Sequence, residues 1–312
     1  MRLALAVFAS ETGTHLLRPP ETARWRAHLR SFDATAYERQ LAERGFRFTP
    51  GLPSLLRSIH DPPVGLFVRG AATFDLLAGP AVAVVGARAC SGYGATVARS
   101  VARELAAAGL VVVSGLARGV DGEAHRGALD AGGTTIAVLG CGIDRDYPAA
   151  HGDLARRIAE SGLIVSEYAP GVEPAPWRFP ARNRIVAGLC AATVVVEARE
   201  RSGALITADL ALEEGREVFA VPGEITSALS AGTNGLLKLG ATPLTSAADV
   251  LASFGIETPV SDTGSPLLEL LPATADELVR RTGRGSAEIA RELVELELAG
   301  RVVARDGVYR PL

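Results

Sequence analysis

The chain of 312 residues lacks the long apolar runs, paired cysteines and strong net charge that mark several large classes of protein. No apolar run approaches the roughly 18 residues that a membrane-spanning helix needs, so we expect no membrane association. Leu3–Phe8 is too short for a signal-peptide core, and we interpret it as the first packed segment. Cys90, Cys141 and Cys190 are odd in number and lack metal-ligand spacing, which favours a reduced cytoplasm and no bound metal.

Lysine is almost absent, since Lys238 is the only lysine among the 32 basic residues. The net charge of −3 argues against a protein whose whole surface binds polyanions. Local charge matters more, because arginine makes two-pronged contacts with phosphate and stacks on bases better than lysine does. The sequence also contains no G-x-x-x-x-G-K-[ST] loop, so we expect no nucleotide hydrolysis. It has no recognisable nucleophile elbow, and we expect no catalytic residue and no cofactor.

What the chain does contain is a central series of short apolar runs that alternate with helical patterns. The runs are Val82–Val85, Leu110–Val113, Thr135–Leu139, Leu163–Val165, Thr193–Val196 and Val218–Val221. The helical patterns are Ala95–Ala108, Glu123–Ala131, Leu154–Ser161, Leu205–Glu214 and Leu236–Leu239. Continuous apolar runs are typical of buried parallel strands, and this alternation predicts βαβ units. The expected fold is α/β, with a doubly wound, Rossmann-like parallel sheet.

The segments on either side of this core have other patterns. We predict a short helical region over residues 1–46, the core over 47–252, a linker over 253–266 and a winged helix over 267–312. The core opens with an extended, proline-rich connection over residues 47–70. The winged helix is predicted from three helical stretches and a hairpin around Asp306-Gly307. These stretches are Leu267–Leu271, Ala275–Thr282 and Ala287–Ala299, and the hairpin pairs Val302-Val303 with Val308-Tyr309.

Four turns of the core carry small residues, hydroxyls, backbone N–H groups and arginines, which suit phosphate. They are Gly86–Gly94, Ser114–Asp121, Phe179–Arg184 and Glu197–Thr207. Turns of this kind gather at the carboxyl ends of the strands of an open α/β sheet, where ligands bind. The candidate DNA- or phosphate-binding residues are Gly86, Arg88, Ser91, Gly94, Ser114, Gly115, Arg118, Arg178, Phe179, Arg182, Asn183, Arg184, Ser202, Gly203 and Thr207.

Each of these turns also has a plainer interpretation. Ser91 and Ser202 are expected to open helices, where they either bind phosphate or serve only as caps. The stretch 177–184 interleaves two aromatic residues with three arginines, as single-strand binders do, but the aromatic rings could instead anchor the loop. Asp121 and His125 share a helical face, which fits either a general base or, as we favour, a cap and a packed histidine.

The predicted recognition helix of the winged helix has the wrong charge for DNA. It carries four acids against Arg291 alone, namely Glu288, Glu292, Glu295 and Glu297. Such a face would repel a phosphate backbone. A protein contact, a regulatory role or simple packing fits this helix better.

The ordered series of turns resembles the DNA-processing protein A (DprA, or Smf) family from about Arg47 to Val250, with a weaker similarity beyond. The turn Gly232–Gly235 is similar to a late glycine turn of that family. The resemblance implies a single-stranded-DNA-binding protein that protects incoming DNA and loads the recombinase RecA in natural transformation. It also implies a homodimer and a reduced form of the family's small helical (SAM-like) N-terminal domain. Trp177 departs from the family's usual residue.

Two other function classes stay open at this point. One is a Rossmann-like enzyme that acts on small nucleotides, similar to the LOG-type phosphoribohydrolases, because phosphate loops and Glu197 near a strand end would suit it. The P-G-G-x-G-T loop of that family is missing, and Arg199–Ser202 stand in its place. The other is a structural scaffold, which would leave the clustered arginines unexplained.

Overall fold

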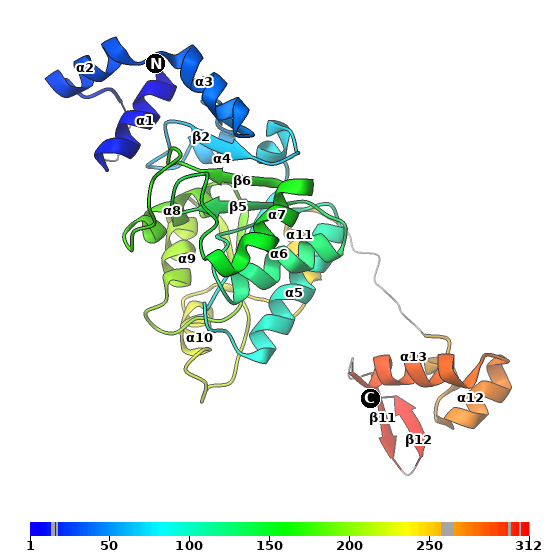
Figure 1. The fold of residues 1–312 in the computed structure, drawn as a ribbon. Helices are drawn as coiled ribbons and strands as arrows, with labels where there is room; N and C mark the ends of the chain where they lie inside the picture. Colours follow the sequence, from blue (N-terminus) through cyan, green and yellow to red (C-terminus); the bar gives the residue numbers. More distant parts are fainter. Residues whose placement is uncertain (14–15, 17, 257–264, 299–300, 306, 312) are drawn as a thin grey trace. The chain divides into compact units, whose positions relative to one another are not determined.

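The computed structural model describes residues 1–13, 16, 18–256, 265–298, 301–305 and 307–311. The chain falls into two compact units, Met1–Ile256 and Glu257–Leu312, which we describe separately (Figure 1). Among the described residues, no helix combines the length and the hydropathy that crossing a membrane requires.

The first unit is built around a nine-stranded sheet with the order β1-β2-β6-β5-β4-β3-β7-β8-β9. The strands are β1 Phe46–Thr49, β2 Leu66–Arg69, β3 Ala81–Val85, β4 Val111–Ser114, β5 Thr135–Leu139, β6 Leu163–Ser166, β7 Ala192–Val195, β8 Glu217–Ala220 and β9 Thr242–Pro243. In this order, all neighbouring strands of the part β6-β5-β4-β3-β7-β8-β9 pair in parallel. Strands β1 and β2 add an antiparallel edge next to β6.

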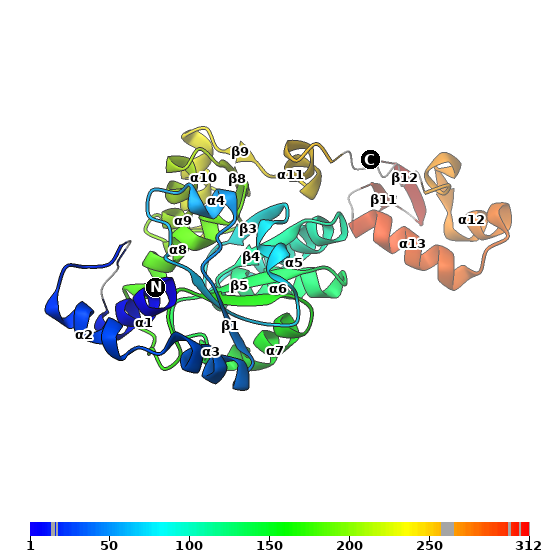
Figure 2. The ribbon, with the colours of Figure 1, turned by 90° about the horizontal axis from the view of Figure 1, so that it is seen from above.

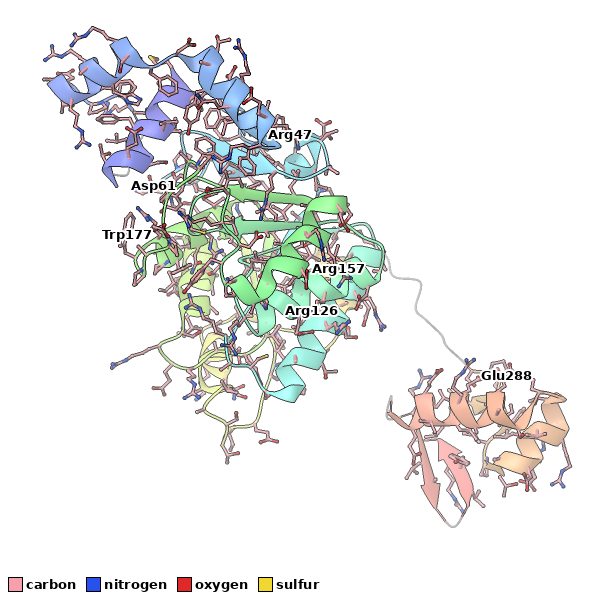
Figure 3. All side chains as sticks on the ribbon, in the orientation of Figure 1. Arg47, Asp61, Arg126, Arg157, Trp177 and Glu288 are labelled. Carbon is pink, nitrogen blue, oxygen red and sulfur yellow. The ribbon has the colours of Figure 1, made fainter. Side chains whose placement is uncertain are left out.

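Helices cover both faces of this sheet, which is why its strands are apolar throughout (Figure 2). In β3, Ala83 and Val85 pack with α8 and α9, whereas Val82 and Val84 pack with α5 and α6. The helices of this part are α4 Ser54–Arg57, α5 Gly92–Ala107, α6 Val120–Asp130, α7 Gly152–Ser161, α8 Arg178–Gly188, α9 Gly203–Glu213, α10 Ala231–Lys238 and α11 Ala247–Ser253, with the 3-10 helices η1 Phe74–Ala78 and η2 Ala149–His151. Outer surfaces are polar; for example, Arg126 pairs with Glu123, and Arg157 with Asp130 (Figure 3).

The predicted α/β fold is confirmed, and the six predicted strands are β3 to β8, each within one residue of the expected ends. The helices begin earlier than predicted, because their first turns contain glycine and polar residues that show no apolar periodicity. The proline-rich connection also holds more structure than expected. Phe46–Thr49 forms β1, whose Phe48 lies opposite Phe67 of β2 with the rings 5.0 Å apart.

Three helices precede the sheet: α1 Arg2–Thr12, α2 Ala23–Ser31 and α3 Ala34–Glu43. Helix α1 is buried almost all round. Leu3 and Val7 join a core cluster with strands β5 and β6, and Leu5 and Phe8 pack with Trp25 of α2. The interpretation of Leu3–Phe8 as a packed segment is therefore confirmed.

The second unit is a winged helix. It contains η3 Leu268–Leu270, β10 Ala273–Thr274, α12 Ala275–Thr282, α13 Ser286–Leu298, β11 Val302–Arg305 and β12 Val308–Pro311, with the strands in the order β10-β12-β11. A capping box between Thr274 and Glu277 starts α12. The first predicted helical stretch is a short 3-10 helix, and Ala299 and Asp306 lie outside the described residues.

Helices α5 and α6 pack closely against each other at Gly127. A Cβ on Gly127 of α6 would overlap the backbone carbonyl of Arg99 in α5. Gly127→Ala should therefore lower the free energy of unfolding by about 1–3 kcal/mol, as overpacking does. Gly92→Ala is the matched control, since nothing lies within 4 Å of its Cβ position. Urea unfolding checks this, and equal stability of the two variants would contradict the packing described.

Candidate nucleic-acid interface

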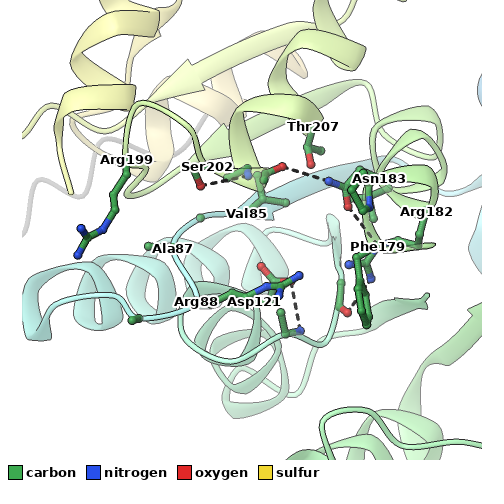
Figure 4. Close-up of a pocket in the computed structure, with 18 of the residues that line it drawn as sticks. Val85, Ala87, Arg88, Asp121, Phe179, Arg182, Asn183, Arg199, Ser202 and Thr207 are labelled. Atoms are coloured by element: carbon green, nitrogen blue, oxygen red, sulfur yellow. Dashed lines mark hydrogen bonds between the residues drawn. The ribbon is translucent and has the colours of Figure 1, made fainter. Parts of the chain in front are cut away.

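A pocket of about 400 Å³ lies at the point where the order of the parallel strands reverses (Figure 4). From β3 the chain proceeds through α5 to β4 on one side, and from β7 it proceeds through α9 to β8 on the other. Loops leaving β3 and β7 therefore diverge and open a crevice, the usual ligand site of open α/β sheets. We call it the switch-point pocket. Its lining includes Gly86, Arg88, Gly115, Asp121, Phe179, Arg182, Asn183, Arg199, Arg201, Ser202, Gly203 and Thr207.

The charge of the pocket is predominantly positive. Arg88, Arg199 and Arg201 are exposed at its edge, and Arg182 is buried in its floor. Asp121 is the acid of the lining, and its burial raises its pKa despite the nearby Arg182 guanidinium. Four guanidinium groups against one carboxyl suit a ligand with several negative charges.

An aromatic pair lies beside these arginines. The ring of Phe179 stacks on Tyr147, with centroids 5.3 Å apart and planes inclined by 27°. Tyr147 is 45% exposed, so part of its ring is open to solvent. The guanidinium of Arg88 lies 5.3 Å from the centroid of Phe179. Unpaired bases stack on aromatic faces, and an exposed cation beside such faces can contact the phosphates of the same strand.

Arg182 has a different role from the one predicted. It lies in the second turn of α8, which begins at Arg178, so Arg182-Asn183-Arg184 lie inside the helix and not at its start. Its guanidinium donates to the carbonyl oxygen of Gly115 at 2.7 Å and to that of Val138, and it is 5% exposed. A Cβ on Gly115 would overlap this guanidinium. Arg182 therefore joins the ends of β4 and β5 below the pocket.

The start of α9 is the helix N-terminus that opens into the pocket. Ser202 caps it by accepting from the N–H of Ala204 at 3.3 Å. Gly203 is exposed and has nothing within 4 Å of its Cβ position, and Thr207 lines the pocket one turn further on. Asn183 donates to the carbonyl oxygen of Gly203 at 3.1 Å, which fixes α8 against this turn. Free N–H groups and the positive end of the helix dipole favour phosphate here.

The start of α5 is already occupied by an anion from the protein itself. Glu197, which follows β7 and is 4% exposed, accepts from the Ser91 hydroxyl at 2.5 Å and from the Ser91 N–H at 2.8 Å. Ser91 also caps the helix by accepting from Gly94 at 3.0 Å, and a Cβ on Gly94 would overlap the carboxylate. Neither Ser91 nor Gly94 lines the pocket. The carboxylate of Glu197 takes the place that a phosphate would need at this helix.

The other sequence candidates lie outside the pocket lining. Ser114 is fully buried and donates to the carbonyl oxygen of Val84, and Arg118 is exposed in the same loop. Arg178 donates to the carbonyl oxygen of Glu173 and lies over Tyr168 and Trp177. Arg184 is buried in ion pairs with Asp61 and Glu167.

The structure supports the packed histidine but not the cap: α6 begins after Gly119 without a side-chain cap, and Asp121 lies inside the helix. Asp121 accepts from the N–H of Ala117 at 3.2 Å and so closes the loop before α6. His125 is fully buried, with Nδ1 2.7 Å from the hydroxyl of Thr135, and burial lowers its pKa to about 3. A histidine held neutral in the core fits packing rather than proton transfer at the pocket.

Sequence reasoning missed Arg199, Arg201 and Tyr147 as site residues. The two arginines stand in the turn Glu197–Thr207, but attention to helix capping favoured Ser202. Tyr147 stands in the connection after β5, a strand whose carboxyl end faces the same edge of the sheet. Ligand-binding residues can lie in any turn at that edge of the sheet, and by this criterion Tyr147 is also a candidate.

Glu197 is expected to stabilise the fold through its contacts with Ser91. Glu197→Ala should lower the free energy of unfolding by about 2–3 kcal/mol, because it removes two hydrogen bonds that a carboxylate accepts at a buried helix N-terminus. Glu200→Ala is the control, since Glu200 is exposed in the same turn. Urea unfolding measures both variants, and a Glu197 variant as stable as the control would refute this role.

Comparisons with known proteins agree with this architecture. Residues 46–255 match the family described as DNA recombination-mediator protein A, and residues 258–307 match the DprA winged helix domain. The DNA processing protein DprA of Streptococcus pneumoniae is 52% identical over 199 residues, 64% of this chain and 70% of that protein. Protein Smf of Escherichia coli is 41% identical over 278 residues, 82% of this chain and 74% of that protein.

Two solved structures are also similar. The X-ray structure of DprA from Streptococcus pneumoniae has a TM-score of 0.69 at 40% identity, covering 82% of this chain and 93% of that chain. DNA processing protein A from Helicobacter pylori, described for its single-stranded DNA binding mode, has a TM-score of 0.62 at 33% identity, covering 67% and 95%. The two family models together span most of the chain, and the chain belongs to the DNA recombination-mediator protein A (DprA, Smf) family.

Proposed function

We propose that this protein binds single-stranded DNA in the switch-point pocket, without chemical change to the strand. The observation that carries the proposal is the set of exposed guanidinium groups of Arg88, Arg199 and Arg201 around the open N-terminus of α9. Phosphates would lie against these groups and against the N–H groups of Gly203 and its neighbours. The net charge of −3 is no obstacle, since the basic groups are local.

The aromatic pair explains why the strand would be single. Tyr147 and Phe179 offer flat faces beside the cations, and a base can stack on them only when it is unpaired. A duplex keeps its bases stacked inside and would meet the arginines alone. The Helicobacter pylori relative, whose description names single-stranded DNA, supports the same ligand here.

The family supports a wider role that the pocket alone does not specify. We propose that the bound strand is handed to the recombinase RecA during recombination or natural transformation, in the cytoplasm, by a homodimer of this chain. The core, residues 47–252, would hold the DNA. The winged helix would not hold DNA. Its Glu288 and Glu292 form ion pairs with Arg284, and the remaining acids of α13 are exposed and would repel phosphate.

Membership of this family disfavours the alternative of a LOG-type phosphoribohydrolase. The structure adds a physical reason. The N-terminus of α5, the first phosphate loop of such a fold, is filled by Glu197. A small nucleotide would have to displace a buried carboxylate.

Removing Arg88 should weaken single-strand binding while the fold stays intact. Arg88→Ala deletes an exposed guanidinium beside Phe179, and we expect roughly a five- to tenfold loss of affinity for an oligonucleotide. Arg156→Ala is the control of equal charge change, since Arg156 is exposed on α7 and does not line the pocket. Fluorescence anisotropy measures both variants. Unchanged affinity together with unchanged melting would count against the pocket.

Salt should weaken the complex. Four exposed arginines, Arg88, Arg118, Arg199 and Arg201, lie in or beside the pocket turns. If each holds one phosphate, about 0.7 log unit per contact gives a slope of roughly −3 in log affinity against log salt. A salt titration with a single strand and a duplex of equal length tests this. A flat titration, or tighter binding of the duplex, would contradict the proposed site.

Removal of the winged helix should leave most of this binding in place. Residues 1–256 form a compact unit with the whole pocket, so a chain that ends at Ile256 keeps the arginines and the aromatic pair. We expect less than a threefold change in affinity for a single strand, measured by anisotropy. A truncated chain that melts normally but binds more than tenfold more weakly would show that the winged helix holds DNA.

A further inference from the structure

Helix α2 is a second place, outside the switch-point pocket, where arginines gather. Residues 18–31 contain four arginines and a single acid, Glu21. The helix itself contains Arg24, Arg26 and Arg30 and no acid. All three of these arginines are exposed. We call the three side chains the α2 basic face.

Helices α2 and α8 use their arginines differently. Helix α8 also carries three arginines and no acid, but two of them, Arg182 and Arg184, are buried among internal partners. The third, Arg178, donates to a backbone carbonyl oxygen. Among the residues that the structure describes, no acid forms an ion pair with an arginine of α2, and Glu11 lies 3.6 Å from His28 instead. The guanidinium groups of α2 therefore remain available to an anionic ligand.

Contacts with α1 hold α2 with this face outward. Trp25 of α2 is buried against Phe8 of α1, with the ring centroids 5.3 Å apart. Thr22 caps α2 by accepting from the N–H of Trp25 at 3.2 Å. Arg26 and Arg30 are one helical turn apart, so they are neighbours on one side of the helix. An anchored helix thus presents two adjacent cations to solvent, and a ligand need not order the backbone that carries them.

Helices α8 and α1 connect the switch-point pocket with α2. Phe179 lines the pocket, whereas Trp177, just before α8, lines a cavity together with Ala6 and Ala9 of α1. Helix α2 packs on α1 through Trp25. Figures 1 and 2 both show α1 between α2 and α8. A single strand that leaves the pocket over the start of α8 would pass the half-exposed ring of Trp177 and then meet the α2 basic face.

We propose that the α2 basic face binds the phosphates of a single DNA strand that extends beyond the switch-point pocket. Guanidinium groups donate paired N–H groups to phosphate, and a helix without acids does not repel the strand. Contacts with phosphates carry no sequence information, so this second contact would accept any base. The inference rests on the proposed single-strand binding and adds to it a contact outside the core, residues 47–252.

Strand length separates the two contacts. A strand of about 6 nucleotides can occupy the pocket alone, whereas one of about 25 nucleotides can also reach α2. Arg26→Gln/Arg30→Gln should lower the affinity for the longer strand about five- to tenfold and change that for the shorter strand less than twofold. Arg103→Gln/Arg156→Gln, which removes the same charge at exposed positions of α5 and α7 outside the pocket lining, is the control. Fluorescence anisotropy measures every pair.

The salt dependence of the same complexes gives a second readout. Each phosphate contact of a single strand contributes about 0.7 log unit of affinity per log unit of salt. With the longer strand, two lost contacts should make the slope of the α2 variant shallower by about 1.4 than that of the unaltered chain. With the shorter strand, the two slopes should agree. A variant that merely folded less well would not change the slope for one strand length alone.

The outcomes separate this inference from the proposed function. If the unaltered chain binds neither strand, the proposed function fails. If the α2 variant binds both strands as tightly as the unaltered chain does, single-strand binding stands and the inference is wrong, as it would be if α2 instead met an acidic protein. An equal loss with both strands would show a disturbed pocket and would also overturn a separate contact. A loss confined to the longer strand, and absent from the control variant, supports the contact at α2.

Discussion

The buried carboxylate of Glu197 at the start of α5 determines where this fold can bind an anion. In an open α/β sheet the first strand–helix turn is the usual phosphate site. Here Glu197 fills it and ties the turn after β3 to the turn after β7 through Ser91. The same contact joins the turns that carry Arg88 and Arg199, two arginines of one pocket, while the N-terminus of α9 also lines that pocket. In the proposed binding mode, phosphate therefore lies at the start of α9 rather than at the start of α5.

Burial divides the many arginines into two groups. Arg182 and Arg184 lie inside, where hydrogen bonds to backbone carbonyls and carboxylates use their charge to hold α8 in place. Such groups are costly to bury unless paired, so they are structural. Arg88, Arg199 and Arg201 remain in solvent and can exchange water for phosphate. Arg182 and Arg184, two of the three arginines near Asn183, therefore contribute a scaffold, and single arginines of other turns contribute the charge of the pocket.

The sequence predicted the architecture well because apolar strand runs and their spacing are strong local signals. Val82–Val85 and Ile136–Leu139 are apolar on both faces, as strands of a sheet covered on both sides are, and the helical patterns between such runs favour parallel pairing. It predicted the site less fully. Nothing local to Arg182 shows that the side chain points inward to Gly115, and nothing near Ser91 shows that a carboxylate 106 residues away will cap the same turn. Such contacts depend on the order of strands, which local patterns do not fix.

The central claim is that a single strand lies in the switch-point pocket against Tyr147 and Phe179. Photo-crosslinking with an oligonucleotide that carries bromodeoxyuridine, followed by peptide mapping, tests it most directly. The account predicts that crosslinks concentrate in the peptides that contain Tyr147 and Phe179. Crosslinks confined to the winged-helix peptides, with none around the pocket, would contradict it.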